Sequence, residues 1–212
     1  MPTAPKGGRY HHGDLRAALV DAAIGLITER GVRGFSLAGA SRRVGVSAAA
    51  PYRHFADREE LLAAVAVCGL QVFAAMVANE ARDADAPEQR LAAMARAYVR
   101  FAAQQRPLFD TLFSAGIDKR RYPELERAWE PVDAFLAVVQ EICEGDKVAA
   151  DALAEALEAT AHGHAALLID GEYGQGTDAV GAAADKAAGA TLALIAGRAA
   201  LHRPVAVDPD TV

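Results

Sequence analysis

Residues 36–55 read SLAGASRRVGVSAAAPYRHF, and this stretch decides the fold of the N-terminal part of the chain. Ser36 is a favoured N-cap for a helix over Leu37–Val44, and Gly45 is a favoured residue for ending that helix. A further serine, Ser47, can cap another, very short helix that reaches about His54, and with the helix that precedes this stretch it is the third of the domain. The order of helix, tight glycine turn and short helix is the outline of a helix-turn-helix.

An amphipathic helix is predicted directly before this stretch. Asp14 can cap it, Gly31 can stop it, and the residues between them place apolar side chains at helical spacing: Leu15, Leu19, Ala22, Ala23, Leu26 and Ile27. Residues 1–13 combine Pro, Gly and polar residues without apolar periodicity, which predicts a mobile arm. We therefore expect a three-helix domain over residues 14–56.

The remaining residues, 57–212, are predicted to form a C-terminal helical domain. About a quarter of the chain is alanine, the strongest intrinsic helix former. The pattern predicts helices over Asp57–Ala81, Pro87–Gln105, Pro123–Glu144, Asp151–Asp170 and Thr177–Leu201, with a short apolar segment at Leu108–Phe113, a loop at 114–122 and a tail at 203–212. Pro131 is expected to kink or restart its helix. The predicted fold class is all-α.

The charge is distributed unevenly along the chain. The 212 residues carry a formal net charge of −6, but residues 1–55 have eight Lys and Arg against three acidic residues, which leaves +5 there and −11 over the remainder. A basic N-terminal quarter joined to an acidic bulk suggests that one part meets a polyanion. A solvated basic face is the alternative.

Compartment and membrane association are also constrained by the sequence. Two cysteines cannot build a disulfide framework, and no secretory leader opens the chain, so we expect a cytoplasmic protein. Leu61–Asn79 has no charged residue and nearly the length of a membrane-spanning helix. Its alanines, its polar residues and its flanking glutamates favour a buried core helix instead.

Several motifs in residues 10–60 resemble the DNA-binding domain of the tetracycline-repressor (TetR-like) family of transcriptional regulators. They are Gly31, the Phe35-Ser36 entry, Gly45-Val46-Ser47, Tyr52-x-His54-Phe55 and the acid-rich start of the next helix. The opening YHHGDLR, the segment SAAAPYRHF and the later AHGHAALLIDG resemble a subgroup with a Trp-His-Gly-like C-terminal motif, although Thr160 and Ala161 stand where the tryptophan is expected.

The resemblance implies that Ser47–His54 is a recognition helix that enters the major groove of DNA. Its alanines and Pro51 cannot form bidentate bonds with bases, so they would read thymine methyl groups by apolar contact. By the resemblance, Tyr52 and His54 contact phosphate, and Arg58 takes a position usually held by a lysine. The candidate DNA-binding residues are Arg42, Arg43, Ser47, Ala48, Ala49, Ala50, Pro51, Tyr52, Arg53, His54 and Arg58. Packing or plain solvation is the alternative for each side chain, and Lys6 and Arg9 could enter a minor groove.

The resemblance also implies an effector pocket and a dimer interface in the C-terminal domain. The candidate pocket residues are Tyr98, Phe101, Phe109, Phe113, Trp129, Phe135 and His162, with His164 beside them; ordinary core packing is the alternative. The last two helices supply a candidate interface of small and apolar residues at Ala156, Ala159, Leu167, Ala183, Ala187, Ala190, Leu194 and Leu201.

The sequence lacks the motifs of common enzymes and cofactor sites. His11-His12 and His162-x-His164 do not have the spacing of a metal site, and no GxSxG, phosphate-binding glycine loop or Rossmann fingerprint occurs. We expect no enzyme activity, metal or cofactor. The function predicted is that of a ligand-inducible repressor that binds a DNA operator as a homodimer, and that responds to a small-molecule effector. The alternatives are a ligand-independent DNA-binding protein and a helical small-molecule-binding protein.

Two residues in the predicted helix over Leu37–Val44, Gly39 and Ala40, depart from the family pattern. Gly39 costs about 1 kcal/mol against alanine inside a helix. Ala40 stands where a larger aliphatic residue is usual. Together they predict that the small domain is under-packed.

Overall fold

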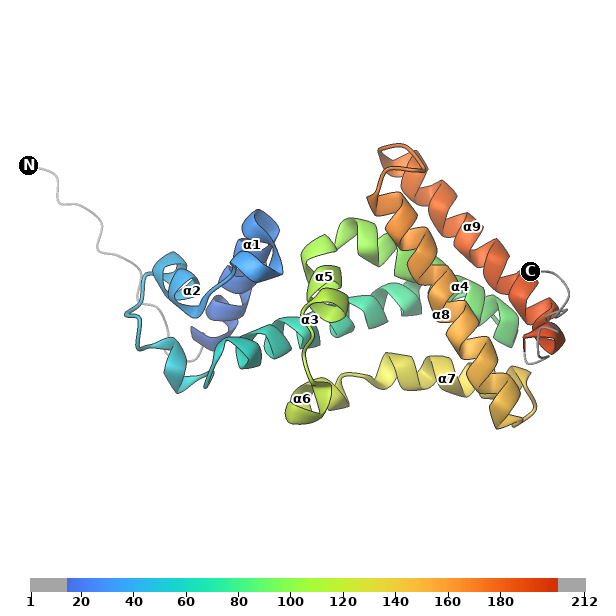
Figure 1. Ribbon diagram of the computed structural model, residues 1–212, viewed down its shortest axis with the longest axis horizontal. Helices are drawn as coiled ribbons and strands as arrows, with labels where there is room; N and C mark the ends of the chain where they lie inside the picture. The colour runs from blue at the N-terminus through green and yellow to red at the C-terminus, as the bar shows by residue number, and fades with distance from the viewer. Residues whose placement is uncertain (1–14, 202–212) are drawn as a thin grey trace, which may run out of the picture. The chain divides into compact units, whose positions relative to one another are not determined.

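The computed structural model describes residues 15–201, and every regular element in that range is a helix (Figure 1). The helices are α1 (Leu15–Gly34), α2 (Leu37–Val44), η1 (Pro51–Arg53), α3 (Arg58–Glu80), α4 (Pro87–Gln104), α5 (Arg106–Ser114), η2 (Lys119–Arg121), α6 (Pro123–Arg127), α7 (Glu130–Ile142), α8 (Lys147–Ile169), α9 (Thr177–Ala196) and η3 (Arg198–Ala200). The all-α fold class is confirmed. The predicted arm over residues 1–13, with Lys6, Arg9 and the histidine pair, and the Asp14 cap lie outside the described residues.

Capping residues define α2 as the sequence predicts. The Ser36 Oγ accepts a hydrogen bond from the Gly39 N–H at 3.1 Å, and Gly45 ends the helix in the left-handed conformation at φ 79°. Gly31 also has a positive φ, 69°, and interrupts the helical geometry of α1 three residues before its end. The two glycines therefore shape the turns that the sequence assigns to them.

The predicted third helix differs from the structure. Residues 48–50 form a turn, and only η1 that follows is helical, with 3₁₀ geometry. The cause is Pro51, which has no N–H to donate back to the preceding turn and so cannot extend an α-helix from Ser47. The His54 N–H and the Phe55 N–H both donate to the Pro51 carbonyl, at 2.8 and 2.9 Å, which closes the segment after the turn.

The contact between α1 and α2 is tight rather than under-packed. A Cβ at Gly39 would lie 3.1 Å from the Ser36 Oγ and 3.2 Å from Leu26 Cδ1, and Ala40 is completely buried. The small residues let α2 approach α1 closely, so the predicted looseness of this domain is wrong.

The helices of the second half follow the predicted order with shifted ends. α6 ends at Arg127, and α7 then runs from Glu130, which confirms the predicted restart around Pro131. α8 begins at Lys147, four residues earlier than predicted, because Asp146 caps it. The Asp146 carboxylate accepts from the N–H groups of Val148 and Ala149 at 3.0 and 3.1 Å.

The described chain divides into two compact units. Unit 1 contains residues up to Gly69 together with Pro107–Glu126, and unit 2 contains Leu70–Arg106 and the residues from Arg127 onward. The helix α3 runs from unit 1 into unit 2. The domain boundary after residue 56 stays a prediction, and these units cut the chain at other places.

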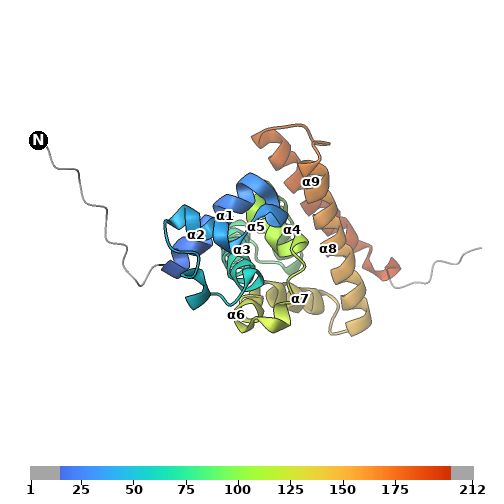
Figure 2. The same cartoon turned by 60° about the vertical axis from the view of Figure 1, so that its left-hand side comes forward.

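Each unit has its own apolar core. In unit 1 the largest fully buried side chains include Leu19, Phe55, Leu61 and Leu62. In unit 2, α4 packs against α8 and α9, which lie side by side (Figure 2). The α4, α7, α8 and α9 core there comprises Leu91, Val139, Ile142, Cys143, Ala150, Leu153, Leu157 and Ile195.

Two helices, α3 and α9, are long and apolar enough to cross a membrane by length and composition alone. Both pack within the molecule: Leu61 and Val65 of α3 have no exposed surface, and neither do Ala183 and Ala187 of α9. Their apolar residues thus serve the cores of the two units, as expected for Leu61–Asn79.

Candidate nucleic-acid interface and effector site

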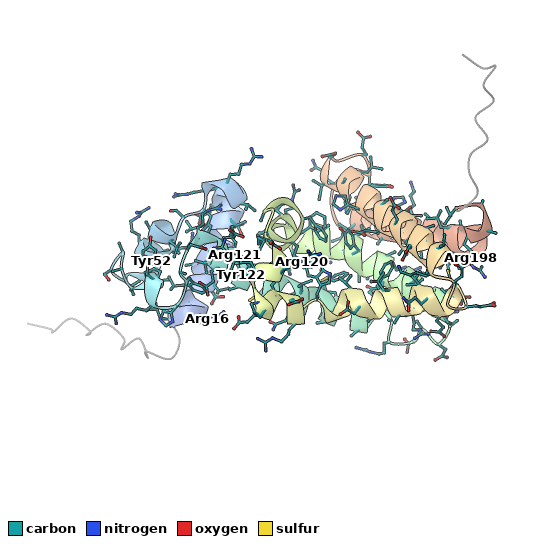
Figure 3. All side chains as sticks on the ribbon, turned by 60° about the horizontal axis from the view of Figure 1, so that its bottom comes forward. Arg16, Tyr52, Arg120, Arg121, Tyr122 and Arg198 are labelled. Atoms are coloured by element: carbon teal, nitrogen blue, oxygen red, sulfur yellow. The ribbon has the colours of Figure 1, made fainter. Side chains whose placement is uncertain are left out.

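The recognition segment, residues 47–54, combines exposed side chains with a buried base, by which we mean Pro51 and the adjacent Phe55. Pro51 is buried and Phe55, directly after the segment, is only 1% exposed, whereas Tyr52 is 61% exposed. The Tyr52 side chain is labelled in Figure 3. Of the predicted DNA-binding set, Pro51 alone is buried.

The exposed members of that set lie in α2, the turn and η1. They are Arg42, Arg43, Ser47, Ala48, Ala49, Tyr52 and Arg53, with Ala50, His54 and Arg58 half-buried. Arg43 donates to the Glu29 carboxylate at 2.7 Å, and its guanidinium lies close to the backbone of Gly25. Arg43 is therefore held against α1, while Arg42 and Arg53 are exposed on the same unit.

Arg58 makes contacts that the sequence does not predict. Its Nε donates to the Phe35 carbonyl at 3.1 Å, its Nη2 donates to the Val32 carbonyl, and its guanidinium lies 5.4 Å from the centre of the Phe35 ring. These carbonyls follow the break at Gly31, where the chain leaves helical geometry and acceptors need new donors. Phosphate contact by Arg58 stays a prediction, but the side chain also ties α3 to the connection between α1 and α2.

Three of the predicted pocket residues meet in unit 2. The Tyr98 hydroxyl and the His162 Nδ1 lie 2.9 Å apart, joining α4 to α8. Phe73 of α3 lies edge-on to Tyr98, with ring centres 5.9 Å apart, and 5.5 Å from Phe101. Burial and, second, the charge of Glu158 raise the pKa of Tyr98, so its phenol keeps its proton. Phe73 is not among the predicted pocket residues, because helical spacing alone does not separate it from core residues.

The other predicted pocket residues lie elsewhere. Phe109 and Phe113 belong to unit 1 and pack on each other, with ring centres 4.8 Å apart. Phe135 packs on the core around Val139, and Trp129 is half-buried at the start of α7. The seven residues therefore do not form one cluster.

A second polar group in unit 2 involves the loop between α8 and α9. The His164 Nδ1 and the Tyr173 hydroxyl lie 2.6 Å apart, and the Lys186 Nζ lies 4.9 Å from the centre of the Tyr173 ring. Burial, followed by the charge of Lys186, lowers the pKa of His164.

An open cavity of about 300 Å³ lies in unit 2 where α4 and α8 end and α9 begins. Its lining includes Arg106, Gln175 and the glycines of the loop, and none of the predicted aromatic residues. The sequence gives no signal for this cavity, because its lining is mostly alanine and glycine. Within residues 15–201, no three His, Cys, Asp or Glu side chains are grouped to hold a metal ion.

Family models match both parts of the chain. Residues 19–65 match the model for bacterial regulatory proteins of the tetR family, and residues 91–191 match the tetracyclin repressor-like C-terminal domain. The two matches together cover more than half of the sequence and include the recognition segment.

Solved structures share this fold across most of their length. A protein of unknown function from Rhodococcus sp. RHA1 is 30% identical, with 87% of this chain and 98% of that chain covered and a TM-score of 0.65. The TetR family transcriptional regulator PfmR from Thermus thermophilus is 22% identical, with 84% and 96% covered and a TM-score of 0.54. RolR in complex with resorcinol is 21% identical, with 91% and 95% covered and a TM-score of 0.60.

No curated protein sequence matches the chain. The two family models nevertheless agree with the helix-turn-helix geometry and with the shared fold. The chain belongs to the TetR family of DNA-binding transcriptional regulators.

Proposed function

We propose that this protein is an effector-responsive repressor that binds a pseudo-palindromic operator as a homodimer. The observation that carries the proposal is the recognition segment, in which Tyr52 is 61% exposed above a buried base. A tyrosine hydroxyl on an exposed turn can donate to a phosphate oxygen, as phosphate-positioning side chains do. The alanines before it are small enough for close approach to base edges.

The DNA contacts divide into two kinds under this proposal. Ala48, Ala49 and Ala50 touch thymine methyl groups in the major groove, and Tyr52 and His54 bind the backbone on either side. Arg42 and Arg53 add positive charge at the same surface, and charge of this kind binds all sequences in a salt-dependent way. Specificity therefore depends on shape and methyl contacts more than on hydrogen bonds to bases.

The effector is expected in unit 2, beside the pair formed by Tyr98 and His162. Two facing polar atoms among the rings of Phe73 and Phe101 suit a small apolar molecule with one hydroxyl or carbonyl group. RolR, a protein of the same fold, was solved with resorcinol bound. Effector binding would shift the population toward an arrangement of the dimer that no longer fits both half-sites, about 34 Å or a multiple of that apart.

The homodimer is proposed to form through α8 and α9, where Leu167 and Leu192 are 45% and 43% exposed. Ala159 is also exposed there, and it allows close helix packing. Two predicted interface residues must be corrected, however. Ala183 and Ala187 have no exposed surface because the faces of α9 that carry them pack inside unit 2.

A cytoplasmic location and the lack of catalytic activity follow from the proposed role as a regulator.

Footprinting on the DNA that flanks the gene for this protein tests the proposal. Full-length protein, with random-sequence competitor and a salt series, is expected to protect two half-sites related by symmetry. Tyr52→Phe keeps the ring and removes only the hydroxyl, so it should weaken binding to all sequences alike. Equal affinity for the protected and random duplexes would refute operator recognition. Unchanged operator affinity across a panel of hydroxylated aromatic compounds would favour ligand-independent binding.

A further inference from the structure

A segment remote in sequence belongs to the same unit as the helix-turn-helix. The chain re-enters unit 1 after Arg106 and leaves it after Glu126. The end of this stretch, residues 119–126, contains η2 and most of α6, and we call it the clamp segment. Two of its side chains form ion pairs with the helices that frame the recognition segment.

The first contact of the clamp segment joins it to the start of α3. The Arg121 Nη2 lies 3.1 Å from the Asp57 Oδ2, and its Nη1 lies 3.1 Å from the Glu59 Oε2. Asp57 also caps α3, accepting from the Glu60 N–H at 2.9 Å. One guanidinium therefore holds both the cap and the first turn of α3.

The second contact leads to the base of the recognition segment. Glu124 accepts a hydrogen bond from the Arg16 Nη2 at 2.8 Å. The Arg16 guanidinium also lies 5.3 Å from the centre of the Phe55 ring, directly after the recognition segment. The clamp segment is thus connected through Arg16 to Phe55, which is 1% exposed and directly follows the recognition segment in the chain.

We propose that Arg121 is a positioning residue for operator binding, which fixes the start of α3 and, with Glu124, the base of the recognition segment. The inference rests on the proposed function, since it concerns the same operator complex. Arg121 also neutralises Asp57 and Glu59, whose charges would otherwise repel the phosphates that approach this unit. The clamp segment ends where the chain passes from unit 1 into unit 2, so it lies at a direct covalent connection between the DNA-binding unit and the unit in which the effector site is proposed.

The strength of these pairs sets the size of the expected effect. The Arg121 side chain is 57% exposed and those of Asp57 and Glu59 are 43% and 38% exposed, so solvent and salt screen the attraction. Exposed pairs of this kind tune geometry more than they stabilise a fold. We expect loss of both pairs to weaken operator binding by about threefold to tenfold at low salt, and by less at high salt.

The test compares Arg121→Gln with Arg120→Gln in the full-length protein. Both variants lose one positive charge from η2, which matches them for general attraction to DNA. Arg120 is exposed, and its backbone N–H donates to Asp118 at 3.1 Å, so removing its side chain leaves both ion pairs in place. Two quantities are measured: the Kd for the footprinted duplex at low and high salt, and hydrogen exchange of residues 55–62 without DNA.

The proposal expects R121Q to bind more weakly than R120Q at low salt, with a difference that shrinks as salt rises. R121Q should also exchange faster at residues 55–62. In a double-mutant cycle, E59Q should reduce the effect of R121Q, and the swapped pair E59R/R121E should recover part of the affinity lost in R121E. These couplings separate positioning from simple destabilisation.

Equal operator affinities for R121Q and R120Q at low salt overturn the inference, as do strictly additive effects in the cycle. If the wild-type protein protects no specific site, the proposed function fails instead. In that case hydrogen exchange alone tests whether Arg121 fixes the start of α3. Faster exchange at residues 55–62 in R121Q than in R120Q supports this role, and equal exchange overturns it.

Discussion

Replacing Arg58 distinguishes a residue that holds the fold from one that only binds phosphate. Arg58→Ala removes the hydrogen bond to the Phe35 carbonyl at 3.1 Å, the one to the Val32 carbonyl, and the contact with the Phe35 ring. Hydrogen bonds from a charged group contribute about 1.5–3 kcal/mol each, and a partly exposed cation over a ring about 0.5–1 kcal/mol. Because the side chain is half-buried, we expect the free energy of unfolding to fall by about 2–3 kcal/mol in total.

The assay is urea unfolding followed by circular dichroism at one fixed protein concentration, since dimerisation contributes to the measured stability. Arg58→Lys keeps the charge but lacks the planar guanidinium whose separate Nε and Nη2 atoms donate to the two carbonyls, so it should lose about half as much stability as the alanine variant. Arg53→Ala is the matched control: this exposed arginine of the same unit should change stability by less than about 0.5 kcal/mol. R58A could instead have the same free energy of unfolding as R53A, while the slope of log K for DNA binding against log salt concentration becomes shallower by about one. That result would refute the structural role of Arg58 as a donor to the two carbonyls, and it would assign Arg58 to phosphate contact.

Two further predictions concern packing and protonation. Gly39→Ala should give no gain in stability, although helix propensity alone favours alanine by about 1 kcal/mol, because the new Cβ would crowd Leu26. Thermal unfolding of G39A checks this, with Ala38→Gly at the exposed neighbouring position as the control that should lose about 1 kcal/mol of stability. A clear rise in Tm for G39A would contradict the prediction. The lowered pKa of His164 means that the unfolded chain binds its proton more readily, so its contribution is complete above about pH 6.5 and is lost as pH falls toward the folded pKa. Stability measured from pH 7 to pH 5 should therefore decline less in His164→Gln than in the wild type, and parallel declines would remove His164 from this role.

Local rules explain why so much of the N-terminal unit could be predicted. The ends of α2 follow from Ser36 and Gly45, whose side-chain oxygen and positive φ each satisfy a requirement of a helix terminus. The serine cap alone predicts a short helix over the whole recognition segment, because a capping residue does not indicate how Pro51 alters the turn that follows. The tight packing at Gly39 escapes prediction for a different reason: whether a glycine leaves a void or permits a close approach depends on Leu26, which lies on another helix.

The candidate sites show the same division between local and non-local information. Tyr98 and His162 could be nominated as polar residues in an apolar region, and they face each other in the structure. Their aromatic neighbour Phe73 could not be nominated, because its position depends on how α3 packs against α4. The cavity near Arg106 has no sequence signal at all, since it is bounded mainly by backbone and methyl groups.

The charge asymmetry of the sequence also changes meaning once the units are known. Counting from residue 1 to 55 places the basic character in the helix-turn-helix and assigns Arg120 and Arg121 to the acidic remainder. In the structure both arginines belong to unit 1, and the Arg121 side chain, although 57% exposed, forms ion pairs with Asp57 and Glu59 at the start of α3. Under the proposed role of Arg121, the positive potential available to DNA depends partly on residues 107–126, a stretch that unit 2 precedes and follows in the sequence. Release of the Arg121 guanidinium would then leave Asp57 and Glu59 to repel the approaching phosphates, and it would lower the DNA affinity without unfolding any helix.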